Sequence, residues 1–85
     1  MSRTYLTEIK KRLNSEIKDT VSVTVVNNTL VIDIYKRDVL KWHYIIPNIS
    51  IKLSSYISAK IVADTIIDRY KSYILDKYFL SKKLK

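Results

Sequence analysis

The sequence predicts one α+β domain, built in the order helix, three-stranded antiparallel sheet, long second helix, packed as a sheet against two helices. Three observations carry this prediction. Apolar residues recur every three or four positions from Leu6 to Ile17, the spacing of one helix face. Three runs rich in β-branched residues follow, separated by two short polar turns. A second helical pattern then continues to about Leu80 without a glycine or proline to break it.

The first helix is predicted from Leu6, Ile9, Leu13 and Ile17, which lie three, four and four residues apart. Charged residues fall on the opposite face, as expected where a helix meets water. We expect one domain over residues 1–85, with a basic tail at about 81–85.

The sheet is predicted from three alternating runs. Val21–Val26 and Thr29–Tyr35 are joined by two asparagines, which tolerate the positive φ of a tight hairpin turn. A second turn at residues 36–38 leads into a third run, Val39–Ile46. Strict alternation in this run predicts one buried face and one open face. The buried face would hold Leu40, Trp42, Tyr44 and Ile46, and the open face Lys41 and His43.

The second helix is predicted to be longer than the sheet. Pro47 ends the third strand, residues 49–53 alternate like a short extended segment or edge strand, and Ser54 or Ser55 can cap the helix. About 25 helical residues span about 38 Å, whereas a strand of six or seven residues spans about 20–24 Å. The helix end should therefore extend past the sheet and either fold back over the first helix or meet a second chain. Its predicted protein-interface residues are Tyr73, Tyr78, Phe79 and Leu80.

The composition excludes several classes of site. The chain has no glycine, so it lacks the Gly-rich loops that bind phosphates in P-loop and dinucleotide folds. It has no cysteine and one histidine, which excludes a cysteine zinc site and a histidine cluster. His43 lacks the nucleophile and orienting group of a catalytic set, and Asp64 and Asp68 fit a solvated helix face. We expect no enzyme activity, no metal, no cofactor and no small-molecule substrate.

The net charge of +8, from sixteen Lys and Arg against eight Asp and Glu, favours a polyanionic partner. The predicted nucleic-acid contacts are the cations of the second turn, the open sheet face and the tail: Lys36, Arg37, Lys41, Lys82, Lys83 and Lys85. A basic surface kept for solubility is the alternative. Tyr35 beside Lys41 can stack a base, although an ordinary cross-strand pair is the simpler interpretation.

No apolar run approaches the roughly 20 residues of a membrane-spanning helix, and no secretion signal is visible, so we expect no membrane contact and a cytoplasmic location. A homodimer through the long helix is a further expectation.

The order of elements resembles two groups of proteins. One is the double-stranded-RNA-binding domain, whose second helix begins with a lysine cluster and a Gly-rich approach. The corresponding segment here, Ser54–Lys60, has one lysine and no glycine, so this resemblance implies the layout and not the RNA-clamping residues. Over about Val21–Phe79 the chain also resembles small phage and mobile-element accessory proteins, including anti-CRISPR inhibitors, in length, layout and Lys/Ile/Tyr/Asn bias. That resemblance implies residence in the host cytoplasm and action on a nucleic-acid-handling complex.

These observations lead to one expected function and two alternatives. We expect a non-enzymatic basic binding protein of phage or mobile-element type that engages nucleic acid or a nucleoprotein complex, for example as an inhibitor such as an anti-CRISPR. The first alternative is a protein-only inhibitor or accessory subunit that binds through the C-terminal helix. The second is a domain that binds double-stranded RNA.

Overall fold

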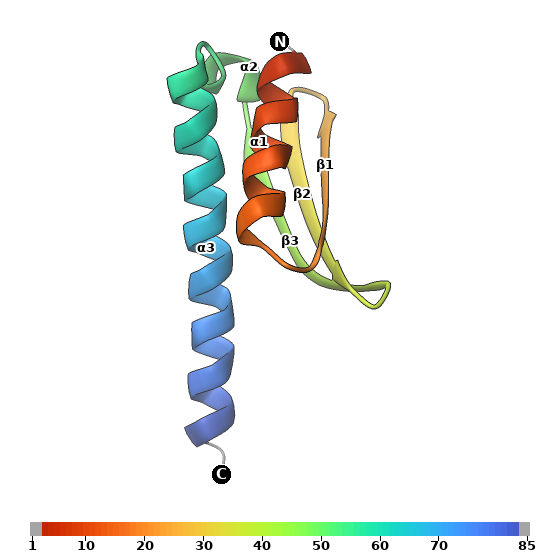
Figure 1. Cartoon of the computed structure of the whole chain (residues 1–85), viewed down its shortest axis with the longest axis vertical. Coiled ribbons are helices and arrows are strands. Elements are labelled where there is room, and N and C mark those ends of the chain that lie inside the picture. Colours follow the sequence, from red (N-terminus) through yellow and green to blue (C-terminus); the bar gives the residue numbers. More distant parts are fainter. Residues whose placement is uncertain (1–2, 84–85) are drawn as a thin grey trace.

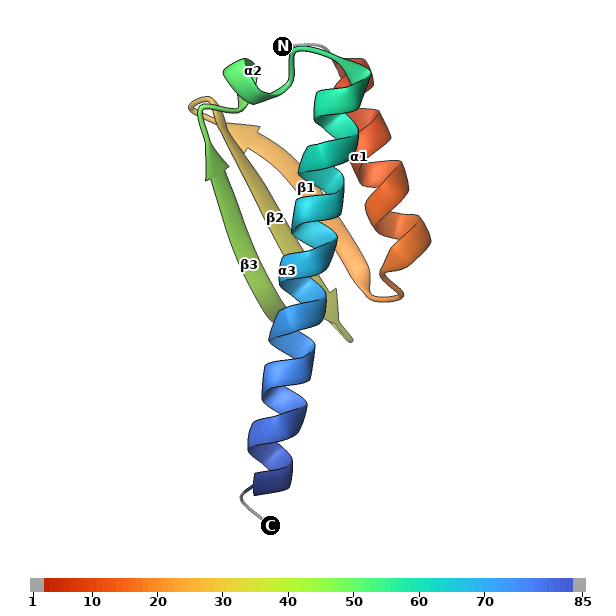
Figure 2. The same ribbon diagram turned by 90° about the vertical axis from the view of Figure 1, so that its left-hand side faces the viewer.

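The computed structural model describes residues 3–83. In chain order its elements are α1 (Arg3–Glu16), β1 (Thr20–Val26), β2 (Thr29–Lys36), β3 (Val39–Pro47), α2 (Ile49–Lys52) and α3 (Tyr56–Lys83). The strands form one antiparallel sheet in the order β1-β2-β3. The two long helices lie side by side over one face of this sheet, and no described element covers the other face (Figures 1 and 2). The predicted α+β layout is confirmed.

Both hairpin turns use residues with positive φ. Asn27 and Asn28 have φ of 49° and 56°, and Arg37 and Asp38 have φ of 52° and 62°. Two successive left-handed residues are the signature of the tight primed turn, whose twist matches that of the strands it joins. The asparagine turn was predicted from the sequence. In the second turn, an arginine and an aspartate accept the same conformation.

The core lies between the sheet and the helix pair. From α1 it receives Ile9 and Leu13, and from the central strand β2 it receives Leu30, Ile32 and Ile34, all fully buried. The facing stripe of α3 supplies both small and large buried residues: Ala59, Val62, Ala63, Ile66, Ile67 and Tyr70. The two alanines let α1 approach α3 closely, since small side chains shorten the distance between helix axes.

A bulge in the second hairpin changes the predicted faces of β3. Ile34 pairs with Trp42, but the next residue, Tyr35, pairs with Leu40, so Lys41 is an extra residue without a cross-strand partner. Leu40 is 53% exposed and shares the open face with Tyr35. Lys41 reaches the helix-covered side instead, where it contacts Asp19 and Tyr70. The predicted assignments of Leu40 to the buried face and Lys41 to the open face are therefore wrong.

The segment after β3 is helical, not extended as the sequence suggested. Asn48 has φ of 55° and turns the chain into the single helical turn α2. Two hydrogen bonds fix α2 to the first hairpin turn. The backbone carbonyl of Asn28 accepts from the Ile49 N–H at 3.0 Å, and the Asn28 side-chain oxygen accepts from the Ser50 N–H at 2.9 Å. Buried Ile49 and Leu53 anchor the turn to the core.

Helix α3 begins as predicted and extends well beyond the sheet. The Ser55 hydroxyl accepts a hydrogen bond from the Ser58 N–H at 3.2 Å, which is N-capping geometry. From there 28 residues span about 42 Å, whereas the 14 residues of α1 span about 21 Å. The C-terminal part of α3 consequently projects past α1 and the strands in both views (Figures 1 and 2).

Candidate functional site

The strongest candidate site is the projecting part of α3. Four of its apolar side chains remain more than half exposed: Leu75 at 55%, Tyr78 at 54%, Phe79 at 57% and Leu80 at 61%. We name these four residues the C-terminal overhang. The rings of Tyr78 and Phe79 meet edge-on, with centroids 5.9 Å apart. Exposed aromatic and aliphatic side chains gathered at one end of a small domain mark an interaction surface.

Tyr73 was predicted to belong to this surface, and the structure places it differently. It is partly buried against the core, two residues before the overhang begins at Leu75. The Lys77 ammonium lies over its ring, 5.8 Å from the centroid. Tyr73 therefore joins the overhang to the folded domain, while Tyr78, Phe79 and Leu80 lie beyond it.

A groove adjoins the overhang and extends its apolar surface. It lies between the end of α1, the start of β3 and the middle of α3, and its volume is about 460 Å³. Its apolar lining is Ile17, Tyr70, Ile74 and Leu75, and its charged lining is Glu16, Lys18, Lys41 and Lys71. We name it the α1–α3 groove. Leu75 belongs to both the groove and the overhang, so the two form one continuous surface.

A three-residue network holds the wall of this groove in place. The Asp19 carboxylate accepts hydrogen bonds from Lys41 Nζ at 3.0 Å and from the Tyr70 hydroxyl at 2.8 Å. Both bonds favour the ionised carboxylate and lower the pKa of Asp19, with Lys41 the larger cause. Burial raises the pKa of Tyr70, and the bond to Asp19 raises it further. The hydrogen bond that Lys41 donates to Asp19 raises the pKa of Lys41.

This network has the character of a structural clamp. It joins the α1–β1 connection, β3 and α3, and each of its polar groups is already bonded to another. Shifted pKa values also mark catalytic groups, but such groups need a cleft with a free nucleophile or base. Among residues 3–83 no three His, Cys, Asp or Glu side chains lie together in a way that would hold a metal ion. The arrangement can bind apolar side chains, with cations at its rim.

Two further ion pairs hold the helices together. Arg12 Nη2 of α1 lies 2.8 Å from Asp64 Oδ1 of α3, and this hydrogen bond is the main cause of the raised pKa of Arg12. Glu16 and Lys71 pair at 3.6 Å at the rim of the α1–α3 groove. Asp64 was predicted to lie on a solvated face; its side chain is half exposed and also connects α3 to α1.

Among the predicted nucleic-acid residues whose side chains the structure describes, Lys41 does not share a surface with Lys36 and Arg37. Lys36 and Arg37 are exposed at the β2–β3 turn, while Lys41 is paired with Asp19 under the helices. The side chains of Lys82 and Lys83, and Lys85 altogether, lie outside the described residues. The turn and the overhang lie toward the same end of the molecule (Figure 1).

The open sheet face carries a polar pair, His43 and Asp33. His43 Nδ1 and Asp33 Oδ1, on neighbouring strands, lie 2.5 Å apart. Tyr35 pairs with Leu40 and not with Lys41, so the predicted aromatic–cation pair is absent from this face of the described sheet. Without that pair, this face lacks the aromatic side chain beside a lysine that was expected to stack a base.

The spacing of apolar residues in the sequence also indicates that Leu75 belongs to the overhang. Leu75 lies three residues before Tyr78 and four before Phe79, which places all three on one side of the helix. That side is rotated from the buried stripe ending at Tyr70 and Ile74, so a second apolar stripe begins where the sheet ends. Leu75 was missed because the pattern was followed along a single stripe.

Comparison with known proteins identifies no relative. No family model matches the chain, and no curated protein or solved structure gives a significant match. Within residues 3–83, no helix combines the length and apolar character needed to cross a membrane.

Proposed function

We propose that this chain is a non-enzymatic binding protein that engages a protein partner through the C-terminal overhang and the adjoining α1–α3 groove. One observation carries the proposal: α3 extends past the sheet and presents Leu75, Tyr78 and Phe79 to solvent on one side. Full burial of such a side chain contributes about 1.5–3 kcal/mol, and these side chains, already nearly half buried, would gain part of that in an interface. Aromatic anchors of this kind dominate the binding energy of many interfaces.

The charge around the site indicates the partner's character. Lys18, Lys41 and Lys71 line the groove, with Lys41 paired to Asp19 and Lys71 to Glu16, and the whole chain carries +8. A partner surface with apolar residues inside an acidic rim complements this arrangement. The resemblance to small phage and mobile-element proteins favours an accessory or inhibitory role at a nucleoprotein complex, such as an anti-CRISPR would have.

A pull-down with nuclease treatment tests this proposal. Immobilised wild-type chain is incubated with host lysate, with and without nuclease, beside Phe79→Asp and Ile57→Asp. Ile57 is a matched control because it is an exposed apolar residue of the same helix, at the opposite end from the overhang. We expect a nuclease-resistant partner that is lost with Phe79→Asp and retained with Ile57→Asp. A partner that Phe79→Asp retains would refute the assignment of the overhang.

Direct binding of nucleic acid is the second candidate, favoured by exposed Lys36 and Arg37 at the same end as the overhang. Phosphate contacts by these residues would make binding strongly dependent on salt. In the same pull-down, material that disappears after nuclease treatment would support this candidate in place of the first.

A further inference from the structure

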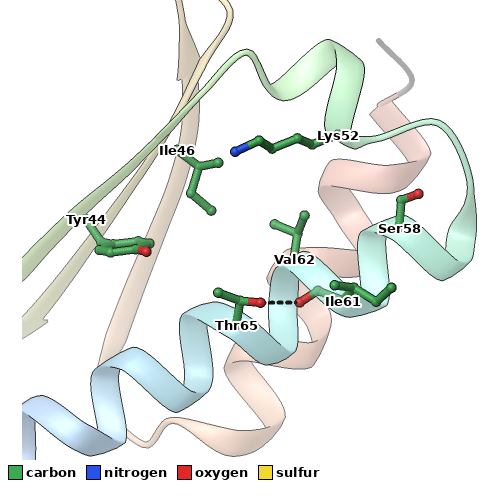
Figure 3. A pocket seen from close by; sticks show the side chains of 7 residues that line it. All are labelled: Tyr44, Ile46, Lys52, Ser58, Ile61, Val62 and Thr65. Atoms are coloured by element: carbon green, nitrogen blue, oxygen red, sulfur yellow. Dashed lines mark hydrogen bonds between the residues drawn. The ribbon is translucent and has the colours of Figure 1, made fainter.

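A second groove lies at the opposite end of the domain, where α3 diverges from β3. Its volume is about 330 Å³ and its floor is formed by Tyr44 and Ile46 of β3. Ser58, Ile61, Val62 and Thr65 of α3 form one wall, and Lys52 of α2 stands at the end near Ile46 (Figure 3). We name this the β3-edge groove. It exists because neither long helix fully covers the inward face of β3 at this end (Figure 2).

Beside this groove runs a free strand edge. β3 is the last strand of the described sheet, so one of its edges faces no other strand. Val26 and Thr29 close the primed turn at Asn27-Asn28 as a hydrogen-bonded pair, and bonded pairs alternate along a strand. The backbone N–H and C=O groups of Val31 and Asp33 therefore point toward β1, and those of Leu30 and Ile32 point toward β3. Ile46 and Tyr44, which pair with Leu30 and Ile32, direct their own N–H and C=O groups toward β2.

The remaining residues of β3 bond outward. His43 and Ile45 direct their N–H and C=O groups away from the sheet, toward the free edge. These groups form a template for one more strand. Alternate side chains of an added strand would point to the helix-covered side, into the groove over Tyr44, Ile46 and Ile61.

The groove also carries a defined charge. Of its lining residues, Lys52 is the charged one, and no carboxylate lines it. Lys52 is held in place because α2 is bonded at Ile49 and Ser50 to the asparagine turn. From this anchored turn the ammonium reaches the end of the groove near Ile46, where a carboxylate would gain a charge-assisted hydrogen bond.

We propose that the β3-edge groove binds an extended, acidic peptide segment of a partner protein, which adds to β3 as a fourth strand. Main-chain bonds to His43 and Ile45 give affinity, apolar side chains fill the groove, and a carboxylate meets Lys52. This site is separate from the C-terminal overhang and does not depend on the function proposed for it.

A second copy of this chain is a poor occupant of the groove. Its own edge strands, β1 and β3, are Thr20–Val26 and Val39–Pro47, and neither contains an aspartate or glutamate. Strand pairing between two copies would therefore bring no carboxylate to Lys52 and would join two chains of net charge +8. The charge pattern favours an acidic peptide from another protein.

The test uses displayed random peptides of about 12 residues, long enough for one strand, panned against the whole chain. We expect enriched peptides to share an aspartate or glutamate with apolar residues at alternate positions. The most enriched peptide is then synthesised with a fluorophore as the probe, and its affinity is measured by polarisation. Peptides that enrich no more than on an unrelated protein of equal charge would overturn the proposal.

Three variants locate the site. Lys52→Glu and Ile61→Glu should each weaken probe binding by about tenfold or more, equal to about 1.4 kcal/mol. Lys60→Glu makes the same charge change on α3 at an exposed residue outside the groove lining and should leave the affinity within about twofold. All three side chains are exposed, so thermal unfolding should stay near that of wild type. Equal affinity for wild type and Lys52→Glu would place the peptide elsewhere.

Alternate N-methylation tests the strand geometry. Two probes are methylated at the backbone nitrogens of odd or of even residues, respectively. In a strand added to one edge, only one of these sets faces β3, so one probe should lose binding and the other should keep it. If both or neither lose binding, strand addition is wrong.

Discussion

Lys41 Nζ donates to Asp19 Oδ2 at 3.0 Å, and this contact crosses from β3 to the connection between α1 and β1. It is possible because the bulge beside Tyr35 turns Lys41 toward the helices. The two side chains are 22% and 21% exposed, so the pair is largely shielded from water. A lysine that the sequence assigned to phosphate binding thus acts in folding, by fixing β3 and α3 to the end of α1.

The first prediction concerns pH. The pKa of Asp19 is lowered below 3.8 by its bonds to Lys41 and Tyr70, so its ionised form is stabilised by folding. This contribution is fully present above about pH 4 and disappears as the pH falls through the lowered pKa. Asp19→Asn should destabilise the chain by about 1–3 kcal/mol at neutral pH. The difference in urea midpoint between variant and wild type should shrink toward pH 2; a constant difference would contradict the network.

The second prediction concerns the aromatic cluster under α3. Trp42 stacks on Tyr44 with ring centroids 5.1 Å apart and lies 5.3 Å from the ring of Tyr70. Because Trp42 is partly buried, Trp42→Ala should cost about 3 kcal/mol, a large share of the stability of so small a domain. His43→Ala is the control, since its exposed ring lies on the open face, and it should cost less than about 1 kcal/mol. Equal melting temperatures for the two variants would show that β3 faces the other way.

Local features of the sequence predicted much of the fold. The asparagine turn, the capping serine and the excess length of α3 each follow from a few neighbouring residues, and all three are present. The bulge at Lys41 was not predictable in this way. The run Val39–Ile46 alternates regularly, and nothing in it marks the one extra residue that reverses the face of every residue before it.

The two candidate sites also differ in how far the sequence predicts them. Exposure of Tyr78 and Phe79 follows from helix length alone, which the sequence reveals. The β3-edge groove depends on the angle between α3 and β3 and on the position of α2. Both are set by tertiary contacts, such as those of Ile49 and Ser50 with Asn28, 21 and 22 residues earlier. Nothing in the alternating segment 49–53 indicated a helical turn anchored there.

The third prediction concerns nucleic acid. If Lys36 and Arg37 contact phosphates, replacing each should reduce the slope of log affinity against log salt by roughly 0.7–0.9. Lys36→Gln and Arg37→Asn are suitable, because asparagine tolerates the positive φ at position 37. Lys41→Gln should leave the slope unchanged, since Lys41 is committed to Asp19. A slope that falls with Lys41→Gln as much as with Lys36→Gln would show that the ion pair opens on binding.

The last prediction concerns self-association through the C-terminal overhang. Leu75 joins the overhang to the α1–α3 groove, so a two-fold copy can place its Tyr78 and Phe79 against the groove of the first chain and receive theirs in return. Two chains of charge +8 repel each other, and added salt screens this repulsion over about 10 Å at 0.1 M. Dimerisation should therefore strengthen with salt, opposite to the trend for phosphate binding.

Light scattering at two salt concentrations measures the dimerisation. Phe79→Asp is expected to remain monomeric and Ile57→Asp to behave as wild type. A wild-type chain that stays monomeric at high concentration and high salt would exclude the dimer. The overhang would then be expected to bind a different protein.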